Sequence, residues 1–268
     1  MVVTGFDAYA PREIAERVQA ACVAKARTPL LSLVMLGFLA GAFIGLGSLF
    51  YVIVVSDASL GFAAQRVLGG LVFSLGLLLV VVAGAELFTG NNLLAMAWAD
   101  GRVTTREVLG NWVVVCLANA AGAAGLALLV FLSGHAEMNG GAVGRTYMQI
   151  AAAKANLPPL AAFVRGILCN VLVCMAVWMT LAGRSVTDKF VALVLPIAAF
   201  VAAGFEHSIA NMYFLPLGFL LQAAAGQPPE LLGLARNLVP VIAGNLVGGS
   251  VLVALVYYVI YRRPAPGT

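Results

Sequence analysis

The chain has 268 residues, of which 62% are hydrophobic and 10% are charged, and its mean hydropathy is +1.02. Soluble domains carry about 25% charged residues, so this composition excludes an ordinary soluble enzyme or binding domain and indicates an integral membrane protein. The pI of about 9.0 does not indicate a nucleic-acid partner, because loop Lys and Arg residues set membrane topology. The four cysteines lie in apolar runs or a predicted helix, so we expect no disulfide, metal or cofactor.

The first predicted element is an amphipathic helix over residues 11–27. Its apolar residues Ile14 and Val18 share one face of the helix, so we expect it to lie along the membrane surface. We take residues 1–29 as an N-terminal cytoplasmic segment that carries this helix.

Six long apolar runs follow, each near the ~20 residues that span a bilayer. They cover about 30–55, 67–99, 108–133, 157–182, 190–223 and 237–261. The second and fifth runs are too long for one simple helix, and polar residues interrupt them at 84–92 and at 206–211. The pattern predicts an all-α membrane domain over residues 30–262, with its second and fifth helices broken, and a cytoplasmic tail over 263–268.

The loop charges predict the orientation of the chain. With the N-terminus in the cytoplasm, ten basic residues lie inside and four outside, as the positive-inside rule requires. The inside set is Arg12, Arg17, Lys25, Arg27, Arg102, Arg106, Arg184, Lys189, Arg262 and Arg263, and the outside set is Arg66, Arg145, Lys154 and Arg236. We therefore expect a multi-pass protein of a bacterial-type inner membrane with both termini in the cytoplasm. Arg165 lies within the fourth run, where we expect it to pair between helices.

The two halves of the chain repeat each other. Three residues at the first interruption recur with the same spacing at the second, and three more recur in the span that follows. The pairs are Gly84 and Gly204, Glu86 and Glu206, Asn91 and Asn211, Asn111 and Asn237, Asn119 and Asn245, and Gly122 and Gly248. Because each half has an odd number of spans, the halves must have opposite orientations, over about 30–133 and 157–261. Inverted repeats with broken helices are a transporter architecture, with the site between the repeats near mid-membrane.

The interruptions place polar chemistry at membrane depth, where a charge costs roughly 3 kcal/mol and usually marks a functional path. The start of a half-helix points unpaired N–H donors and a positive dipole end at the break, which favours an anion. We expect His207 and Thr89, one from each break, to meet and to donate hydrogen bonds to a small anion. Glu86 and Glu206 are expected to hydrogen-bond the backbone that the breaks release. Lys154 is either a snorkelling topology marker or an anion-attracting charge above the pore.

Several apolar residues flank the breaks and have two interpretations, core packing or pore constriction. They are Phe73, Leu77, Phe88, Val173 and Phe200. His135 lies in a predicted polar loop over 133–147 and is expected to be solvated.

Four stretches of the chain resemble the formate/nitrite transporter family, and the resemblance extends over about residues 28–262. These stretches are 86–89, 170–179, 204–212 and 244–249. The resemblance implies an aquaporin-like fold in a homopentamer whose protomers each have a pore. It also implies roles for particular residues: a central His207, Thr89 on the loop of the broken second helix, an outer Lys154, Asn170 and Glu206 in the network around His207, an outer constriction of Phe73 and Phe200, and an inner one of Leu77, Leu87 and Phe88.

The expected function is a channel or transporter for small monovalent anions of weak acids, with formate favoured and with proton coupling through the central His. Nitrite or hydrosulfide is the alternative substrate. An intramembrane enzyme using His207 and Glu206 is disfavoured, because the chain lacks His-Glu-x-x-His, Gly-x-Ser-x-Gly and any Cys/His cluster. A water or glycerol pore is disfavoured because the breaks lack paired Asn-Pro-Ala. The expected partners are the anion, protons, the lipid bilayer and further copies of the chain.

Overall fold

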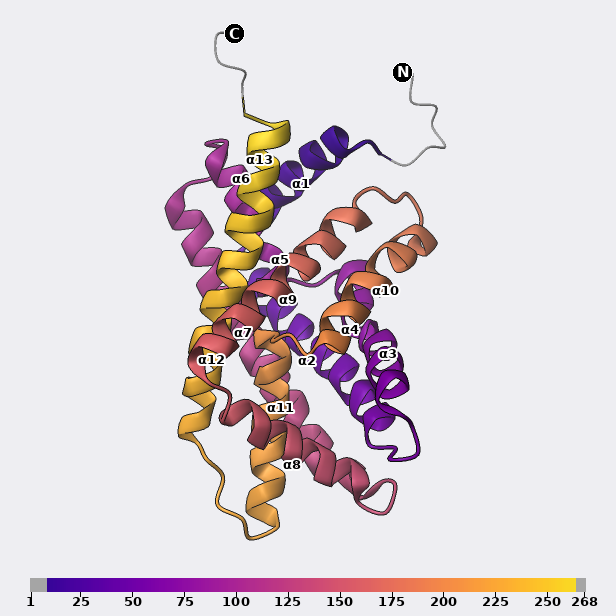
Figure 1. The fold of residues 1–268 in the computed structure, drawn as a ribbon. Coiled ribbons are helices and arrows are strands. Elements are labelled where there is room, and N and C mark those ends of the chain that lie inside the picture. The colour runs from indigo at the N-terminus through magenta and orange to yellow at the C-terminus, as the bar shows by residue number, and fades with distance from the viewer. Residues whose placement is uncertain (1–8, 264–268) are drawn as a thin grey trace.

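The computed structural model describes residues 9–263, which form helices and connecting turns without a strand (Figure 1). Within these residues, six helical segments are long and apolar enough to cross a membrane, as predicted. They are Leu30–Val55, Phe62–Gly84, Thr105–Leu132, Pro159–Thr180, Val186–Ala203 and Leu232–Tyr261. The predicted cytoplasmic tail lies, apart from Arg263, outside the described residues.

The first half of the chain runs from α1 to α7. Its helices are α1 (Pro11–Ala26), α2 (Leu30–Val55), α3 (Phe62–Phe73), α4 (Leu75–Leu78), the π-helical η1 (Leu79–Gly84), α5 (Phe88–Asn91), α6 (Leu94–Ala99) and α7 (Thr105–Leu132). The second half contains the 3-10 turn η2 (His135–Glu137), α8 (Ala142–Ala155), α9 (Pro159–Thr180), α10 (Val186–Ala203), α11 (Ser208–Ala224), α12 (Leu232–Leu246), the π-helical η3 (Val247–Leu255) and α13 (Val256–Tyr261). In Figure 1, α1, α6 and α13 gather at one end of the molecule and α8 lies at the other.

Both predicted helix breaks are present, and each begins at a glycine. Gly84 ends η1 with φ of +84°, and Gly204 follows α10 with φ of +73°. This left-handed backbone suits glycine, which has no Cβ to clash with the preceding turn. Three non-helical residues follow in each case, 85–87 and 205–207, before α5 and α11 begin. The sequence repeat therefore corresponds to the same backbone feature in both halves.

Extensive contacts join α2 to α7 and α9 to the helix formed by α12 and η3. A Cβ at Gly122 would lie 1.9 Å from the carbonyl oxygen of Phe38, and one at Gly248 would lie 2.3 Å from that of Ile167. Small residues let membrane helices approach closely. At these two crossings the backbones are so close that no side chain larger than hydrogen fits.

We expect Gly122→Ala to destabilise the protein by about 1–3 kcal/mol, the usual cost of forcing extra atoms into a packed interior. Gly110→Ala on the same helix is the matched control, because a Cβ there has no atom within 4 Å. Thermal unfolding in detergent measures both variants. Equal melting temperatures for the two would show that the α2–α7 crossing relaxes easily and that the close approach does not limit stability.

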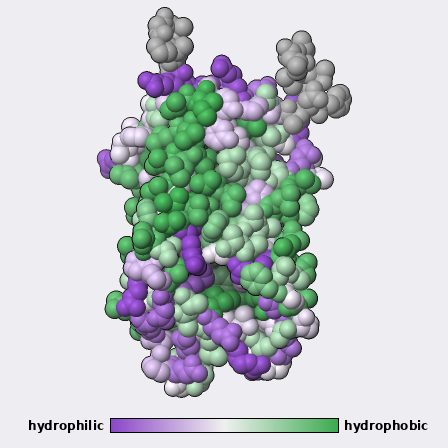
Figure 2. Space-filling view, viewed as in Figure 1, coloured by the Kyte–Doolittle hydropathy of each residue, from purple (hydrophilic) through white to green (hydrophobic). Residues whose placement is uncertain are grey.

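Apolar side chains cover most of the upper half of the molecule in Figure 2 and continue along its sides, and polar side chains lie at the two ends and in a group near the middle of this face. Large apolar residues that are exposed in the protein include Phe62, Leu160 and Leu195, with exposures of 80%, 74% and 71%. Such a surface is compatible with lipid rather than with water.

The structure corrects the prediction of a polar loop over residues 133–147. The segment contains η2 and the start of α8, which packs against α11. The helix was missed because it is short and rich in alanine, so it has no long apolar run. His135 is partly buried against the ring of Tyr147, at 6.3 Å between ring centroids, and this burial lowers the pKa of His135 below its ordinary value.

The predicted N-terminal helix is present as α1, and it packs closely against the rest of the chain. Ile14, Val18 and Cys22 are buried in a cluster shared with α6 and α13. The face that was predicted to be apolar therefore covers protein.

Candidate functional site

The two helix breaks bring Thr89 and His207 together in the centre of the molecule. Thr89 Oγ1 lies 3.0 Å from His207 Nε2, and both side chains are buried. His207 Nδ1 accepts a hydrogen bond from the backbone N–H of Ala210 at 3.1 Å, which caps α11. Since an acceptor nitrogen carries no proton, the neutral imidazole has its proton on Nε2. Nε2–H then donates to Thr89, and the threonine hydroxyl hydrogen is left to point at another acceptor.

Each break is held by one asparagine that bonds to the backbone on both sides of it. Asn119 Nδ2 donates to the carbonyl oxygens of Gly37 and Glu86 at 2.7 and 2.9 Å, and its Oδ1 accepts from the N–H of Phe88 at 2.9 Å. Asn245 repeats this arrangement in the second half. Its Nδ2 donates to the carbonyl oxygens of Gly166 and Glu206 at 2.8 and 3.0 Å, and its Oδ1 accepts from the N–H of Ser208 at 3.0 Å.

Two of the N–H groups at the start of α11, which were expected to face an anion, are used by side chains of the protein. The N–H of Ser208 is taken by Asn245, and the N–H of Ala210 is taken by His207. Side-chain groups at the centre, those of Thr89 and His207, are therefore the donors that we assign to an anion.

The two glutamates bind side chains and not the released backbone that was predicted. Glu86 accepts from Lys25 Nζ at 2.6 Å and from Asn91 Nδ2 at 2.7 Å. Glu206 accepts from Lys154 Nζ at 2.9 Å on both carboxylate oxygens and from Asn211 Nδ2 at 2.6 Å. An ion pair with additional hydrogen bonds is the arrangement that makes a buried carboxylate tolerable.

A cavity of about 260 Å³, the Lys154 vestibule, opens on one side of the centre. Its polar lining includes Lys154, Glu206 and His207, and its apolar lining includes Phe73 and Phe200. The rings of Phe73 and Phe200 meet edge to face, with 5.7 Å between their centroids. The ring of Phe200 also stacks on that of His207, with 5.8 Å between the centroids. The predicted outer residues thus lie in one cavity that ends at His207.

A second cavity of about 330 Å³, the Lys25 vestibule, lies on the other side. It is lined by Lys25, Glu86, Leu77 and Leu87, among others. Leu87 stands in the first half where His207 stands in the second, each three residues after the break glycine. The two cavities therefore approach the centre through equivalent positions of the two repeats.

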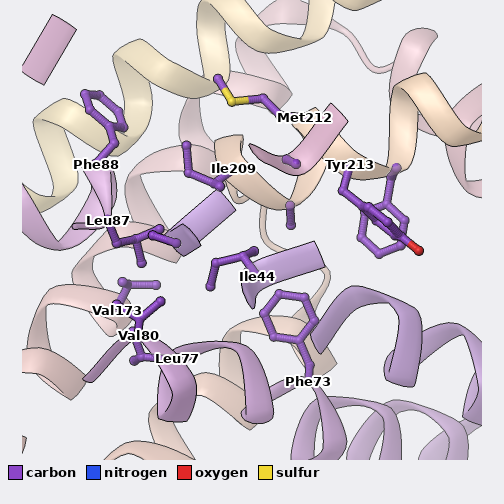
Figure 3. Close-up of a cluster of buried hydrophobic side chains, with 14 of the residues drawn as sticks. Ile44, Phe73, Leu77, Val80, Leu87, Phe88, Val173, Ile209, Met212 and Tyr213 are labelled. Atoms are coloured by element: carbon purple, nitrogen blue, oxygen red, sulfur yellow. The ribbon is translucent and has the colours of Figure 1, made fainter. Parts of the chain in front are cut away.

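Four predicted site residues line neither cavity: Thr89, Phe88, Asn170 and Val173. Figure 3 shows Val173 beside Leu77, Val80 and Leu87, with the ring of Phe88 directed away from them. A layer of buried apolar side chains therefore separates the two cavities.

Asn170 is connected to His207 through Thr89, which bonds to both residues. Its Nδ2 donates to the backbone oxygen of Thr89 at 3.2 Å, to Asn92 Oδ1 at 2.7 Å and to the backbone oxygen of Asn245 at 2.7 Å. It joins the centre by fixing the segment that carries Thr89.

Sequence reasoning missed the second lysine of the site. Lys25 was assigned only as a topology marker, yet it forms the ion pair with Glu86. Its spacing contained the signal, because Lys25 precedes Gly37 by the same number of residues by which Lys154 precedes Gly166.

Arg66 was missed as well. Its guanidinium donates to the carbonyl oxygens of Ala202 and Val201 at 2.7 and 3.1 Å, and so caps the end of α10 at the break.

A membrane-spanning helical protein in which two broken helices hold a buried His–Thr pair between opposed cavities has the form of a channel or carrier for small solutes. The model of the formate/nitrite transporter family matches residues 12–259. The chain belongs to the formate/nitrite transporter family.

Named relatives and solved structures agree with this assignment. The formate channel FocA of Escherichia coli (strain K12) is 39% identical over 274 residues, which cover 96% of both chains. The formate channel BtFdhC of Bacillus thuringiensis is 36% identical and covers 95% of this chain and 96% of its own. A structure described as a pentameric formate channel with formate bound has a TM-score of 0.80 and 37% identity, covering 87% of this chain and 98% of that one. An FNT family ion channel has a TM-score of 0.82 and 29% identity, covering 94% and 99%. These relatives are channels and transporters, which places the chain among transport proteins and not among enzymes.

Proposed function

We propose that this protein is a channel or transporter for small monovalent anions of weak acids, with formate as its preferred substrate. The observation that carries the proposal is the buried His207–Thr89 pair between two vestibules that each contain a lysine. The pair supplies hydrogen-bond donors without a fixed full charge. Conduction needs binding that is weak enough to release the ion. The substrate is taken from the relatives named formate channels.

The proposed path enters at Lys154 and passes between Phe73 and Phe200 to His207 and Thr89. It continues past Leu77, Leu87 and Val173 into the Lys25 vestibule. Phe88 packs behind this inner constriction, and Asn170 and Glu206 support the path from outside it. Protons are the second proposed substrate, carried through His207.

We also propose that the halves are inverted repeats in a transmembrane domain over about 30–262, in a bacterial-type inner membrane. The matched asparagine contacts of the two breaks support this relation. The end of the molecule that carries α1 is proposed to face the cytoplasm. Basic residues meet there, with Arg27 donating to the Arg102 carbonyl and Arg184 lying over Tyr9. The Lys154 vestibule would then open outward.

Flux into protein-only liposomes tests the function, with formate, nitrite, hydrosulfide and lactate compared at equal concentrations. We expect formate to cross fastest and to remain chemically unchanged. Faster nitrite or hydrosulfide flux would overturn the preference but keep the class of function. Chemical conversion of the solute, or glycerol swelling without anion flux, would overturn the class itself.

The solved relative that is described as pentameric leads us to expect a homopentamer. Mass measurement in a gentle detergent should give five copies of the 27.7 kDa chain. Monomers or dimers alone would count against this assembly.

A further inference from the structure

Several residues that line one vestibule have a repeat-related counterpart that lines the other, so the two linings can be compared residue by residue. Glu206, Ala210 and Asn211 in the Lys154 vestibule correspond by repeat spacing to Glu86, Gly90 and Asn91 in the Lys25 vestibule. Lys154 corresponds to Lys25, and each lysine is paired with its own glutamate. The shared features are therefore electrically neutral on both sides.

Of the described residues that line the two vestibules, the charged ones outside these two ion pairs all line the Lys154 vestibule. Arg66 and Arg165 line the Lys154 vestibule, and the Lys25 vestibule has no further charged residue in its described lining. The first contains three cations and one carboxylate, for a net charge of +2. The second contains one cation and one carboxylate, for a net charge of zero.

Of these two arginines, Arg165 is the one whose guanidinium can bind an anion. It lies in α9 one position before Gly166, and the equivalent position before Gly37 holds Leu36, which lines the other vestibule. The side chain of Arg165 is exposed, and among the described residues it forms no hydrogen bond or ion pair, so the expected pairing between helices is absent. Arg66, by contrast, uses its guanidinium to cap α10. A guanidinium presents a fork of donors that matches a carboxylate or nitrite group.

We propose that Arg165 forms an anion-capture site in the Lys154 vestibule, and that the Lys25 vestibule has no counterpart to it. This inference rests on the proposed function, because it assigns an entry site to the path described there. The site binds a small monovalent anion before the anion reaches Phe73 and Phe200. Glu206 does not cancel it, because the carboxylate is already paired with Lys154. The protein therefore saturates at lower anion concentration from the Lys154 side than from the Lys25 side.

The test measures the half-saturating formate concentration from each side. It uses vesicles in which the full chain has one orientation, read from protease access to a terminal tag. At low ionic strength, Arg165→Leu should raise this concentration about three- to tenfold on the Lys154 side, because it removes one of the charges by which a cleft concentrates ions. The change on the other side should stay below about twofold. Added salt should shrink the effect, since the screening length is about 10 Å at 0.1 M.

Leu36→Arg is the mirror variant and should lower the half-saturating concentration on the Lys25 side alone. Arg165→Lys keeps the charge but loses the fork, and we expect an intermediate value for it. Saturable wild-type flux with unchanged values in Arg165→Leu would overturn the capture site. An equal rise on both sides would also overturn it and would assign Arg165 to structure. Formate flux that does not saturate in the wild type would also overturn the capture site, whereas absence of any formate flux would overturn the proposed function instead.

Discussion

His207→Asn is expected to leave a slow anion leak and to abolish the increase in uptake at acidic pH. The variant keeps the start of α11, because asparagine is a favoured N-cap and replaces the bond that His207 Nδ1 makes to Ala210. It loses the imidazole Nε2–H, whose nitrogen lies 3.0 Å from Thr89 Oγ1. The variant therefore separates the structural role of His207 from its capacity to exchange a proton.

The proposed role of a proton rests on the low solvent exposure of the centre. His207 and Phe200 each have an exposure of 3%, and Thr89 has none. A bare small anion in such a constriction faces an idealised Born cost of order 20 kcal/mol, which falls after relaxation. Hydrogen bonds from Thr89 and His207, at about 1.5–3 kcal/mol each for a charged partner, do not offset it. Protonation of the anion removes most of this cost, because desolvation favours the neutral form of an acid.

The geometry adds a condition to this relay. His207 can donate its Nε2 proton without becoming an anion only if Nδ1 is protonated first. A protonated Nδ1 no longer accepts from Ala210, so each relay step breaks the cap of α11. Proton and formate fluxes measured together in liposomes decide the matter. If His207→Asn kept the wild-type ratio of protons to substrate and the wild-type pH dependence, the relay would be refuted and His207 would be a hydrogen-bond donor only.

Asn245→Leu is expected to have the largest effect on stability. The substitution removes three buried hydrogen bonds at once and leaves the N–H of Ser208 and the carbonyl oxygens of Gly166 and Glu206 without this partner. An unsatisfied buried group costs about 1–3 kcal/mol, so the variant should lose several kcal/mol. We expect a large drop in melting temperature and poor recovery of folded protein in detergent.

Two matched variants make this result interpretable. Asn119→Leu removes the equivalent three bonds at the other break and should be about as destabilising. Ser208→Ala lies beside Asn245 but removes a hydroxyl that has no hydrogen-bond partner, so its melting temperature should stay close to wild type. A stable Asn245→Leu would mean that another group, such as water, satisfies the backbone of the break.

The sequence was sufficient for the parts of the structure that repeat or that form long apolar runs. The run over 30–55 became α2, and the shared Gly-x-Glu spacing located both breaks at Gly84 and Gly204. The same repeat brought Thr89 and His207 to equivalent breaks, and the two side chains lie within hydrogen-bond distance. These predictions depend on patterns along the chain, which a sequence displays directly.

The remaining features depend on contacts that no linear pattern displays. Asn119 and Asn245 were found as repeated residues, but their role needs the carbonyl oxygens of Gly37 and Gly166 to lie nearby in space. Helix α8 is rich in alanine and lacks the long apolar run of a membrane span, and it packs against α11. Lys25 escaped notice because the repeat was taken to begin at the first membrane span and not at the helix before it.

At each break, the ion pair of the glutamate and the bond from the asparagine to the preceding span are made within one half of the chain. Glu86 is paired with Lys25, and Asn119 bonds to Gly37, whereas the corresponding contacts of Glu206 and Asn245 are made with Lys154 and Gly166. A rocking carrier needs rigid contacts that make one gate close as the other opens. Here the two halves are joined by more than the central Thr89–His207 contact, because α3 packs against α10 and α7 packs against α11. The chain therefore has contacts through which a movement at one break can reach the other.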